Sequence, residues 1–149
     1  MSMFLEVEHL QPDELFQRCG GFDDPIDREL ARSYENFAIT FQGEPLGFMA
    51  VMMSGDDPED EGEGYAMICW WQTDDEAKYL GEMVATLAKW LWYNWHVPTE
   101  LWSYRDDEHR KTFLRASGFR LFRASNDPTL KCCPWRFRYS GESSLAETE

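Results

Sequence analysis

The clearest hydrophobic pattern lies in the middle of the chain, where two apolar runs flank a polar turn. Residues 36–41 and 46–53 lie on either side of the segment Gln-Gly-Glu-Pro at 42–45, and this arrangement predicts a β-hairpin. The second arm is almost continuously apolar, which is typical of a strand buried on both faces of a sheet. A third apolar run, at residues 65–71, predicts another strand.

Helical spacing follows this strand. Apolar residues recur three and four positions apart over residues 80–91, which predicts a long helix with an apolar stripe. Thr73 and Glu76 match the capping box that opens many helices, so Thr73 should cap this one. The helix should end near Trp95, before Pro98, because the residue before a proline disfavours helical geometry.

Shorter elements are predicted before the hairpin. Residues 3–7 alternate weakly and predict a strand. Pro12 and Pro25 each suit the first turn of a helix, because proline is preferred there. The second of these helices would place three residues on one face: Ile26, Leu30 and Tyr34.

The C-terminal third predicts a strand, a short helix and two further strands. The first strand covers residues 100–105; Asp106 and Asp107 can cap the helix that follows, and Gly118 would end it. A strand then begins at Phe119, and the last strand covers residues 134–140. The whole order predicts a single mixed α/β domain over residues 1–140, with a polar tail at 141–149.

The charge of the chain limits its partners. Twenty-eight acidic residues against 14 basic ones give a formal net charge of −14, so binding to nucleic acid is not expected. No apolar run reaches the roughly 18 residues that a membrane-spanning helix needs. The first residues also lack the basic and apolar regions of a secretory signal. We therefore expect a protein of a cytoplasm, or of somewhere filled from a cytoplasm.

Acidic residues gather in the loop after the hairpin, whereas basic residues gather in the last third of the chain. The loop carries six carboxylates: Asp56, Asp57, Glu59, Asp60, Glu61 and Glu63. Such a run is typical of a solvated loop, and it also suits docking of a basic partner. Both interpretations stay open.

No metal site is expected. The four cysteines form no Cys-x-x-Cys pair, and the adjacent Cys132 and Cys133 cannot easily share a tetrahedral ion. The three histidines show no paired spacing. Reduced and mostly buried thiols are the simplest interpretation.

The segment at residues 100–122 carries a resemblance to a known family. It reads as a strand, an acid-capped short helix and the sequence FLRASGF leading into the next strand. In this it resembles the GNAT (Gcn5-related N-acetyltransferase) fold, and the predicted hairpin and the strand–helix pair before it agree with that family's order. The resemblance implies a central, mostly antiparallel sheet of about six to seven strands with about four helices.

The same segment, ELWSYRDDEHRKTFLRASGFRLF, is also similar to the corresponding part of the GNAT-like internal virion proteins of T7-type tailed phages. This narrower resemblance implies a virion-associated or assembly role. The partners would then be other virion proteins or host proteins, and the location a phage virion or the host cytoplasm.

The family resemblance raises the question of a coenzyme. Active GNAT enzymes carry a loop resembling Arg/Gln-x-x-Gly-x-Gly/Ala, whose amides hold the pyrophosphate of acetyl-CoA at a helix start. The matching residues here are Lys78, Gly81 and Met83. Met83 departs from the pattern, because a long side chain hinders close approach of a phosphate to the backbone. These three residues would hold acetyl-CoA if the protein is active.

The expected helix start argues against that site. With Thr73 as the cap, Gly81 lies in the second or third turn, where its amide is already bonded within the helix. The unpaired amides would belong to Asp74, Asp75 and Glu76, whose carboxylates repel a pyrophosphate. We therefore expect a degenerate acetyl-CoA site and no bound cofactor.

Catalytic residues are equally poorly matched. Many active family members place a proton-donating tyrosine four residues before the glycine, where this chain has Leu114. If the protein is an enzyme, the remaining candidates for proton transfer are Tyr104, Glu63 and His109.

The sequence KWLWYNW at residues 89–95 places aromatic side chains around most of the helix. Such a helix is either buried on several sides or in contact with another molecule. Because large aromatic residues are enriched at protein interfaces, the second interpretation makes Trp90, Trp92 and Trp95 an assembly surface.

Three functions remain open at this point. The first is a phage-type GNAT-like protein with a degenerate acetyl-CoA site and a virion or assembly role. The second is an active acetyl-CoA-dependent N-acetyltransferase. The third is an acidic phage protein that binds a host factor.

Overall fold

The computed structural model of the chain describes residues 4–20, 22–54, 65–73, 76–104, 107–124 and 134–141. Side chains at positions 54, 69–73, 76–79, 104, 122–124 and 134 are outside this description. The elements are, in chain order, β1 (Glu6–Leu10), α1 (Pro12–Arg18), α2 (Pro25–Ser33), β2 (Glu35–Phe41), β3 (Glu44–Ser54), β4 (Tyr65–Thr73), α3 (Glu76–Trp95), β5 (Thr99–Tyr104), α4 (Glu108–Ala116), β6 (Arg120–Ala124) and β7 (Pro134–Tyr139).

The described strands form one seven-stranded sheet in the order β1-β2-β3-β4-β5-β7-β6. Neighbouring strands are antiparallel except for β4 and β5, which are parallel. A parallel pair needs a long crossover, and α3 provides it. The predicted mixed α/β fold with a mostly antiparallel sheet is confirmed.

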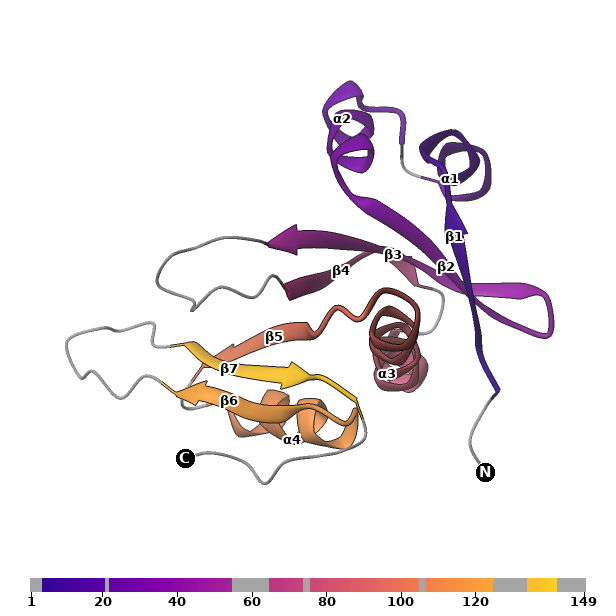
Figure 1. Ribbon diagram of the computed structural model, residues 1–149. Helices are drawn as coiled ribbons and strands as arrows, with labels where there is room; N and C mark the ends of the chain where they lie inside the picture. Colours follow the sequence, from indigo (N-terminus) through magenta and orange to yellow (C-terminus); the bar gives the residue numbers. More distant parts are fainter. Residues whose placement is uncertain are drawn as a thin grey trace.

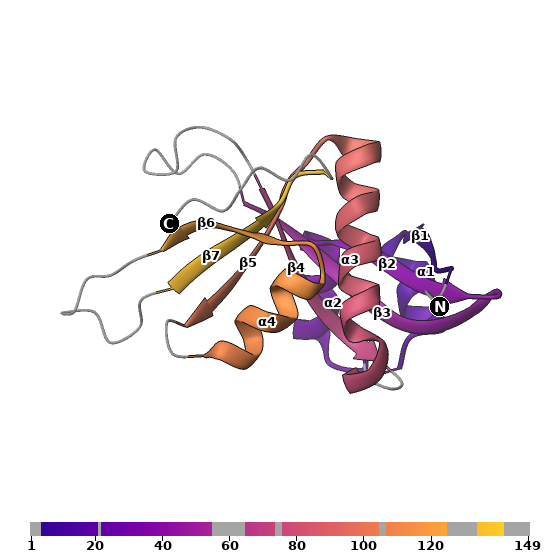
Figure 2. The ribbon, with the colours of Figure 1, turned by 90° about the horizontal axis from the view of Figure 1, so that it is seen from below.

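The four helices cover both faces of the sheet (Figures 1 and 2). Helices α3 and α4 cover one face, while α1 and α2 lie on the other face over the β1–β3 end. The main core lies under α3 and α4 and contains Phe37, Met49, Leu87, Leu114 and Phe119. A smaller core lies under α1 and α2 and contains Leu10, Leu15, Phe22, Ala38 and Phe48.

Alternation along the central strands explains the two cores. Successive residues of a strand point to opposite faces, so in β2 Phe37 and Ile39 enter the main core while Ala38 enters the smaller one. Met49 and Phe48 divide in the same way in β3. The prediction that the second arm of the hairpin is buried on both faces is confirmed for its middle residues.

The end of β4 lies later than predicted. Thr73 is the last residue of β4, where it pairs with Gly47 of β3, and α3 is described from Glu76. The β-branched Thr73 suits a strand, so β4 extends two residues beyond the predicted end at residue 71. Residues 74 and 75 lie outside the described residues, so the cap at Thr73 stays a prediction. The predicted β1 was also placed too early, because the strand begins at Glu6.

The predicted apolar face of α2 was wrong as well. Ile26 and Leu30 are 69% and 41% exposed, and the residue that α2 buries is Ala31. The small Ala31 side chain lets the helix lie close to the sheet, and the Ala31 carbonyl accepts a hydrogen bond from the Asn36 side chain at 2.8 Å. This contact orients the helix with its longer apolar side chains toward solvent.

The helix at residues 108–116 follows the predicted signals. The Asp107 carboxylate accepts a hydrogen bond from the Arg110 amide at 3.0 Å, as an N-cap should. Gly118 ends the helix with a φ of +96°, a conformation that favours glycine. The Phe119 amide then donates to the Leu114 carbonyl at 3.0 Å. This places Phe119 under α4, where it is fully buried.

Candidate coenzyme site

The parallel strands β4 and β5 open toward their carboxyl ends. Within the described strands they share one registered pair, Ala66 with Thr99, near their amino ends, and the Ala66 amide donates to the Pro98 carbonyl at 2.9 Å. Helix α3 begins at the open end, directly after β4. In α/β sheets, ligands bind outside the carboxyl ends of parallel strands, so this opening is the candidate coenzyme site.

The first turn of α3 supplies unpaired amides at this opening. Glu76, Ala77 and Lys78 open the helix, and amides in a first turn have no partner within the helix. The expectation that these amides belong to Asp74, Asp75 and Glu76 agrees with the structure at Glu76, and residues 74 and 75 lie outside the described residues. The predicted repulsion of a pyrophosphate by the three carboxylates stays a prediction, because the side chain of Glu76 also lies outside the described residues.

Gly81 does not lie in a loop. It is the sixth residue of α3, which begins at Glu76, and an amide at that depth bonds within the helix. A Cβ at this position would lie 3.3 Å from the Phe113 ring and 3.5 Å from Ser117 Oγ, both in the α4 segment. The glycine thus allows α4 to pack closely against α3.

Met83 and Lys78 lie on the same helix as Gly81. Met83 is 1% exposed and belongs to the main core. Lys78 is in the first turn of α3, and its side chain lies outside the described residues. The structure therefore places the three motif residues on one continuous helix, with Gly81 against α4 and Met83 against the sheet.

The predicted catalytic residues are not brought into one described constellation. Tyr104 is the last residue of β5 and pairs with Pro134 of β7, and its side chain is outside the description. His109 is exposed in the first turn of α4. Glu63 lies outside the described residues. Leu114 is fully buried in the main core, so this position of α4 supports packing.

Two of the three predicted interface tryptophans form an aromatic cluster on the main core. The Trp90 and Trp95 rings are 5.1 Å apart between centroids, and they lie 5.3 and 5.7 Å from the Phe37 ring. The imidazole of His9 stacks on Phe37 at 4.9 Å and bonds to Glu35 at 2.8 Å. Both tryptophans are half-buried, so each retains some accessible surface.

Trp92 lies on another side of α3, against the end of β7. It is half-buried, and a Cβ built on Gly141 would lie 2.6 Å from its Nε1. Gly141 has a φ of +93°. The chain after β7 therefore turns directly over the indole, and only glycine fits this approach without strain.

Replacing Gly141 with alanine is expected to lower the free energy of unfolding by about 1–3 kcal/mol, because the new methyl group overlaps Trp92 and the backbone is strained. Urea denaturation measures this change. The matched control is Gly20→Ala, since a Cβ at Gly20 has no neighbour within 4 Å; it should change stability by less than about 0.5 kcal/mol. Equal effects of both variants would contradict the close approach.

The sequence interpretation missed a buried ion cluster on β5 and β7. Glu100 is fully buried, and it accepts hydrogen bonds from Arg136 Nε, from Arg138 Nη2 at 2.8 Å and from Trp102 Nε1 at 2.8 Å. Both guanidinium groups lie over the Tyr65 ring, 5.5 and 5.7 Å from its centroid.

A signal for this cluster was present in the last strand. Trp135, Phe137 and Tyr139 pack on the main core, so the arginines between them must point to the other face of the sheet. Two guanidinium groups side by side on one face require an anion, and the buried Glu100 on the neighbouring β5 supplies it.

Metal and membrane features are absent from the part of the chain that the structure describes. That part contains no group of three or more His, Cys, Asp or Glu side chains placed to hold a metal ion. Its helices also lack one that is long and apolar enough to cross a membrane. Cys19 is a buried thiol that donates a hydrogen bond to the Gly20 carbonyl at 3.4 Å. Burial raises the pKa of this thiol to about 11, so it is protonated near neutral pH.

Solved acetyltransferases share this fold over nearly the whole chain. The aminoglycoside acetyltransferase AAC(6')-Ib, solved with coenzyme A, matches with a TM-score of 0.61 and 16% identity, covering 92% of this chain and 95% of its own. NAA60 from Arabidopsis thaliana, solved with acetyl-CoA, matches with a TM-score of 0.55 and 10% identity, covering 92% of this chain and 99% of its own. A Bacillus subtilis acetyltransferase solved with CoA matches with a TM-score of 0.54 and 14% identity, covering 95% of this chain and 100% of its own.

These neighbours are GNAT acetyltransferases, and the chain has a GNAT-like fold. No protein-family model and no curated protein sequence matches the chain. Because the identities are low, the comparison establishes the fold alone.

Proposed function

We propose that this chain is a GNAT-like protein that does not use acetyl-CoA and that acts through contacts with other proteins, as a virion-associated or assembly component of a tailed phage. The observation that supports the loss of acetyl-CoA binding is the position of Gly81. The glycine that would belong to a phosphate-binding loop lies inside α3 and packs against α4.

The residues at the candidate coenzyme site do not fit a pyrophosphate. A phosphate group must approach the backbone closely, which glycine allows and longer side chains hinder. The first described turn of α3 contains no glycine and begins with the carboxylate residue Glu76. The two motif positions further along, Gly81 and Met83, serve packing with α4 and the main core.

The virion role is supported by the resemblance of residues 100–122 to GNAT-like internal virion proteins of T7-type phages. The net charge of −14 favours protein partners over nucleic acid. Mass spectrometry of purified particles tests this role, and we expect the chain to be detected in them. Detection in the infected-cell lysate but not in the particles would contradict it.

Thermal unfolding with and without acetyl-CoA tests the loss of the coenzyme. A ligand at about 100 times its Kd adds roughly 2.7 kcal/mol to the stability of the folded state. We expect no change in Tm at millimolar acetyl-CoA. The aminoglycoside acetyltransferase that was solved with coenzyme A provides the positive control. A rise in Tm that saturates with acetyl-CoA concentration would contradict the proposal.

The opening between β4 and β5 favours a second candidate, an active acetyl-CoA-dependent N-acetyltransferase. Within the described strands, β4 and β5 share one registered pair near their amino ends, so their carboxyl ends are not paired. The unpaired amides of Glu76, Ala77 and Lys78 lie at this same end of the strands. In that case Tyr104, Glu63 and His109 are the candidates for proton transfer. Transfer of a radiolabelled acetyl group to polyamines or lysine peptides would favour this second function.

A further inference from the structure

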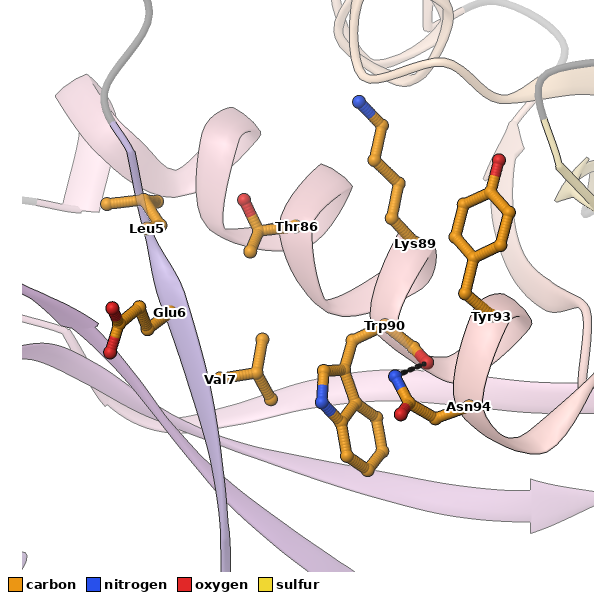
Figure 3. Close-up of a pocket in the computed structure, with 8 residues that line it drawn as sticks. All are labelled: Leu5, Glu6, Val7, Thr86, Lys89, Trp90, Tyr93 and Asn94. Atoms are coloured by element: carbon orange, nitrogen blue, oxygen red, sulfur yellow. Dashed lines mark hydrogen bonds between the residues drawn. The ribbon is translucent and has the colours of Figure 1, made fainter.

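A groove runs between β1 and the flank of α3. It has a volume of about 460 Å³. Its walls include Val7 of β1 and Leu5 just before that strand, with Thr86, Trp90 and Tyr93 from α3. Figure 3 shows Val7 and Trp90 directed toward each other across this groove. The space therefore lies beside the edge of the sheet and has a mainly apolar floor.

Strand β1 forms one edge of the described sheet. Among the described residues it pairs with β2 alone, through residues Glu6–Leu10. The backbone amides and carbonyls on its outer side have no partner in the described ladders. An open edge of this kind can accept a further strand from another chain.

We propose that this β1–α3 groove binds an extended segment of a partner protein, which adds as a strand to the open edge of β1 and alternates apolar with basic residues. The inference rests on the proposed function, because it supplies a surface for the protein contacts on which that function depends.

The apolar half of this pattern follows from the walls of the groove. A strand added to β1 would lie about 4.8 Å from it, and every second side chain would point toward α3. Those side chains would meet the half-buried Trp90 and also Tyr93, a residue that is 57% exposed. Burial of apolar side chains here would remove both aromatic surfaces from water.

The basic half follows from the opposite face of β1. Figure 3 shows Glu6 on the side of β1 that points away from α3. Glu6 and Glu8 are exposed, and Glu8 already pairs with Arg18 at 2.8 Å, so Glu6 is the main anion for a partner. Lys89 also lines the groove, and in Figure 3 its side chain is not directed at the Glu6 carboxylate. Basic side chains on the partner complement this face and the chain's net charge of −14.

A second copy of this chain fits the edge less well. A two-fold antiparallel pairing centred on Val7 would place Glu6 of one copy opposite Glu8 of the other. Like charges directly opposite each other destabilise a strand pair, and two chains of charge −14 repel each other in addition. This argument favours a basic partner of another kind.

Fluorescence anisotropy with a labelled peptide tests the inference on the full chain. The probe is a peptide of about eight residues that alternates lysine with valine, and its matched competitor carries glutamate in place of lysine. We expect saturable binding of the lysine peptide, which weakens as salt is added because exposed charges are screened. The glutamate peptide should bind at least about tenfold more weakly.

Two variants, each with a matched control, locate the binding site. Tyr93→Ala should weaken the lysine peptide about fivefold or more, whereas Ile26→Ala, which removes an exposed apolar side chain from α2, should leave it unchanged. Glu6→Lys should weaken the lysine peptide and strengthen the glutamate peptide. Glu29→Lys makes the same change of charge at an exposed position of α2 and should have little effect.

Several outcomes would overturn the inference. The first two are equal binding of both peptides and absence of binding at millimolar peptide. The third is binding of the lysine peptide that both Tyr93→Ala and Glu6→Lys leave unchanged. The fourth is a dimer of the free chain whose stability changes with Glu6→Lys. These outcomes differ from a failure of the proposed function. Binding of acetyl-CoA would contradict that function while leaving peptide binding at β1 unchanged.

Discussion

Replacing Glu100 with alanine is expected to lower the free energy of unfolding by about 3–5 kcal/mol. The Glu100 carboxylate is fully buried and binds Arg136 and Arg138. Both guanidinium groups are largely buried, with side chains 11% exposed. Removal of the anion leaves two buried positive charges close together, and their repulsion adds to the cost of desolvation.

Urea denaturation at neutral pH measures this effect, and Glu8→Ala is the matched control. Glu8 also binds an arginine at 2.8 Å, but its side chain is 48% exposed and that of Arg18 is 34% exposed. Exposed ion pairs contribute at most about 1 kcal/mol, so the control should lose little stability. Equal losses for Glu100→Ala and Glu8→Ala would contradict the view that burial gives the Glu100 cluster its importance.

Phe119→Ala is expected to cost about 3–5 kcal/mol, because it removes a large side chain from a packed core. Phe119 is fully buried in the main core, and its ring centroid lies 6.1 Å from that of Tyr139. It also follows the glycine that ends α4, so its side chain joins that helix to the sheet. The cavity left by the exchange would loosen both contacts.

The control for this exchange is Phe4→Ala, since Phe4 is 80% exposed. It should change the free energy of unfolding by less than about 0.5 kcal/mol. Chemical denaturation of both variants gives the comparison. Near-wild-type stability of Phe119→Ala would show that the segment from α4 to β6 does not pack as described.

The sequence predicted those elements whose local signals agree with their tertiary contacts. The turn predicted at 42–45 is found at Gln42 and Gly43, between two strands that pair with each other. Asp107 and Gly118 bound α4 by local backbone chemistry. Phe119 could be predicted as a core residue because it follows that glycine directly. In each case a few neighbouring residues decide the conformation.

The errors arose where contacts between residues distant in the sequence determine the local structure. The end of β4 was predicted two residues too early, because the pairing of Thr73 with Gly47 continues the strand. In α2, the hydrogen bond between Ala31 and Asn36 determines which face is buried, so Ile26 and Leu30 become exposed. The periodicity of β4 does not identify Gly47 as a partner, and that of α2 does not identify Asn36.

The candidate site was predictable only in part. The departure from the family pattern at Met83 and Leu114 is visible in the sequence, and both side chains are buried in the core. The contact of Gly81 with Phe113 depends on how α4 packs on α3, which no local signal specifies. The Glu100 cluster likewise requires the pairing of β5 with β7.

The most direct test of the central claim is a nuclear magnetic resonance titration that follows the backbone amides of Glu76, Ala77 and Lys78 while acetyl-CoA is added. These amides open α3 and are the groups that a pyrophosphate would have to bind. If the site is degenerate, their chemical shifts stay constant at millimolar acetyl-CoA. Saturable shifts at these three amides would contradict the claim and identify the protein as one that binds the coenzyme.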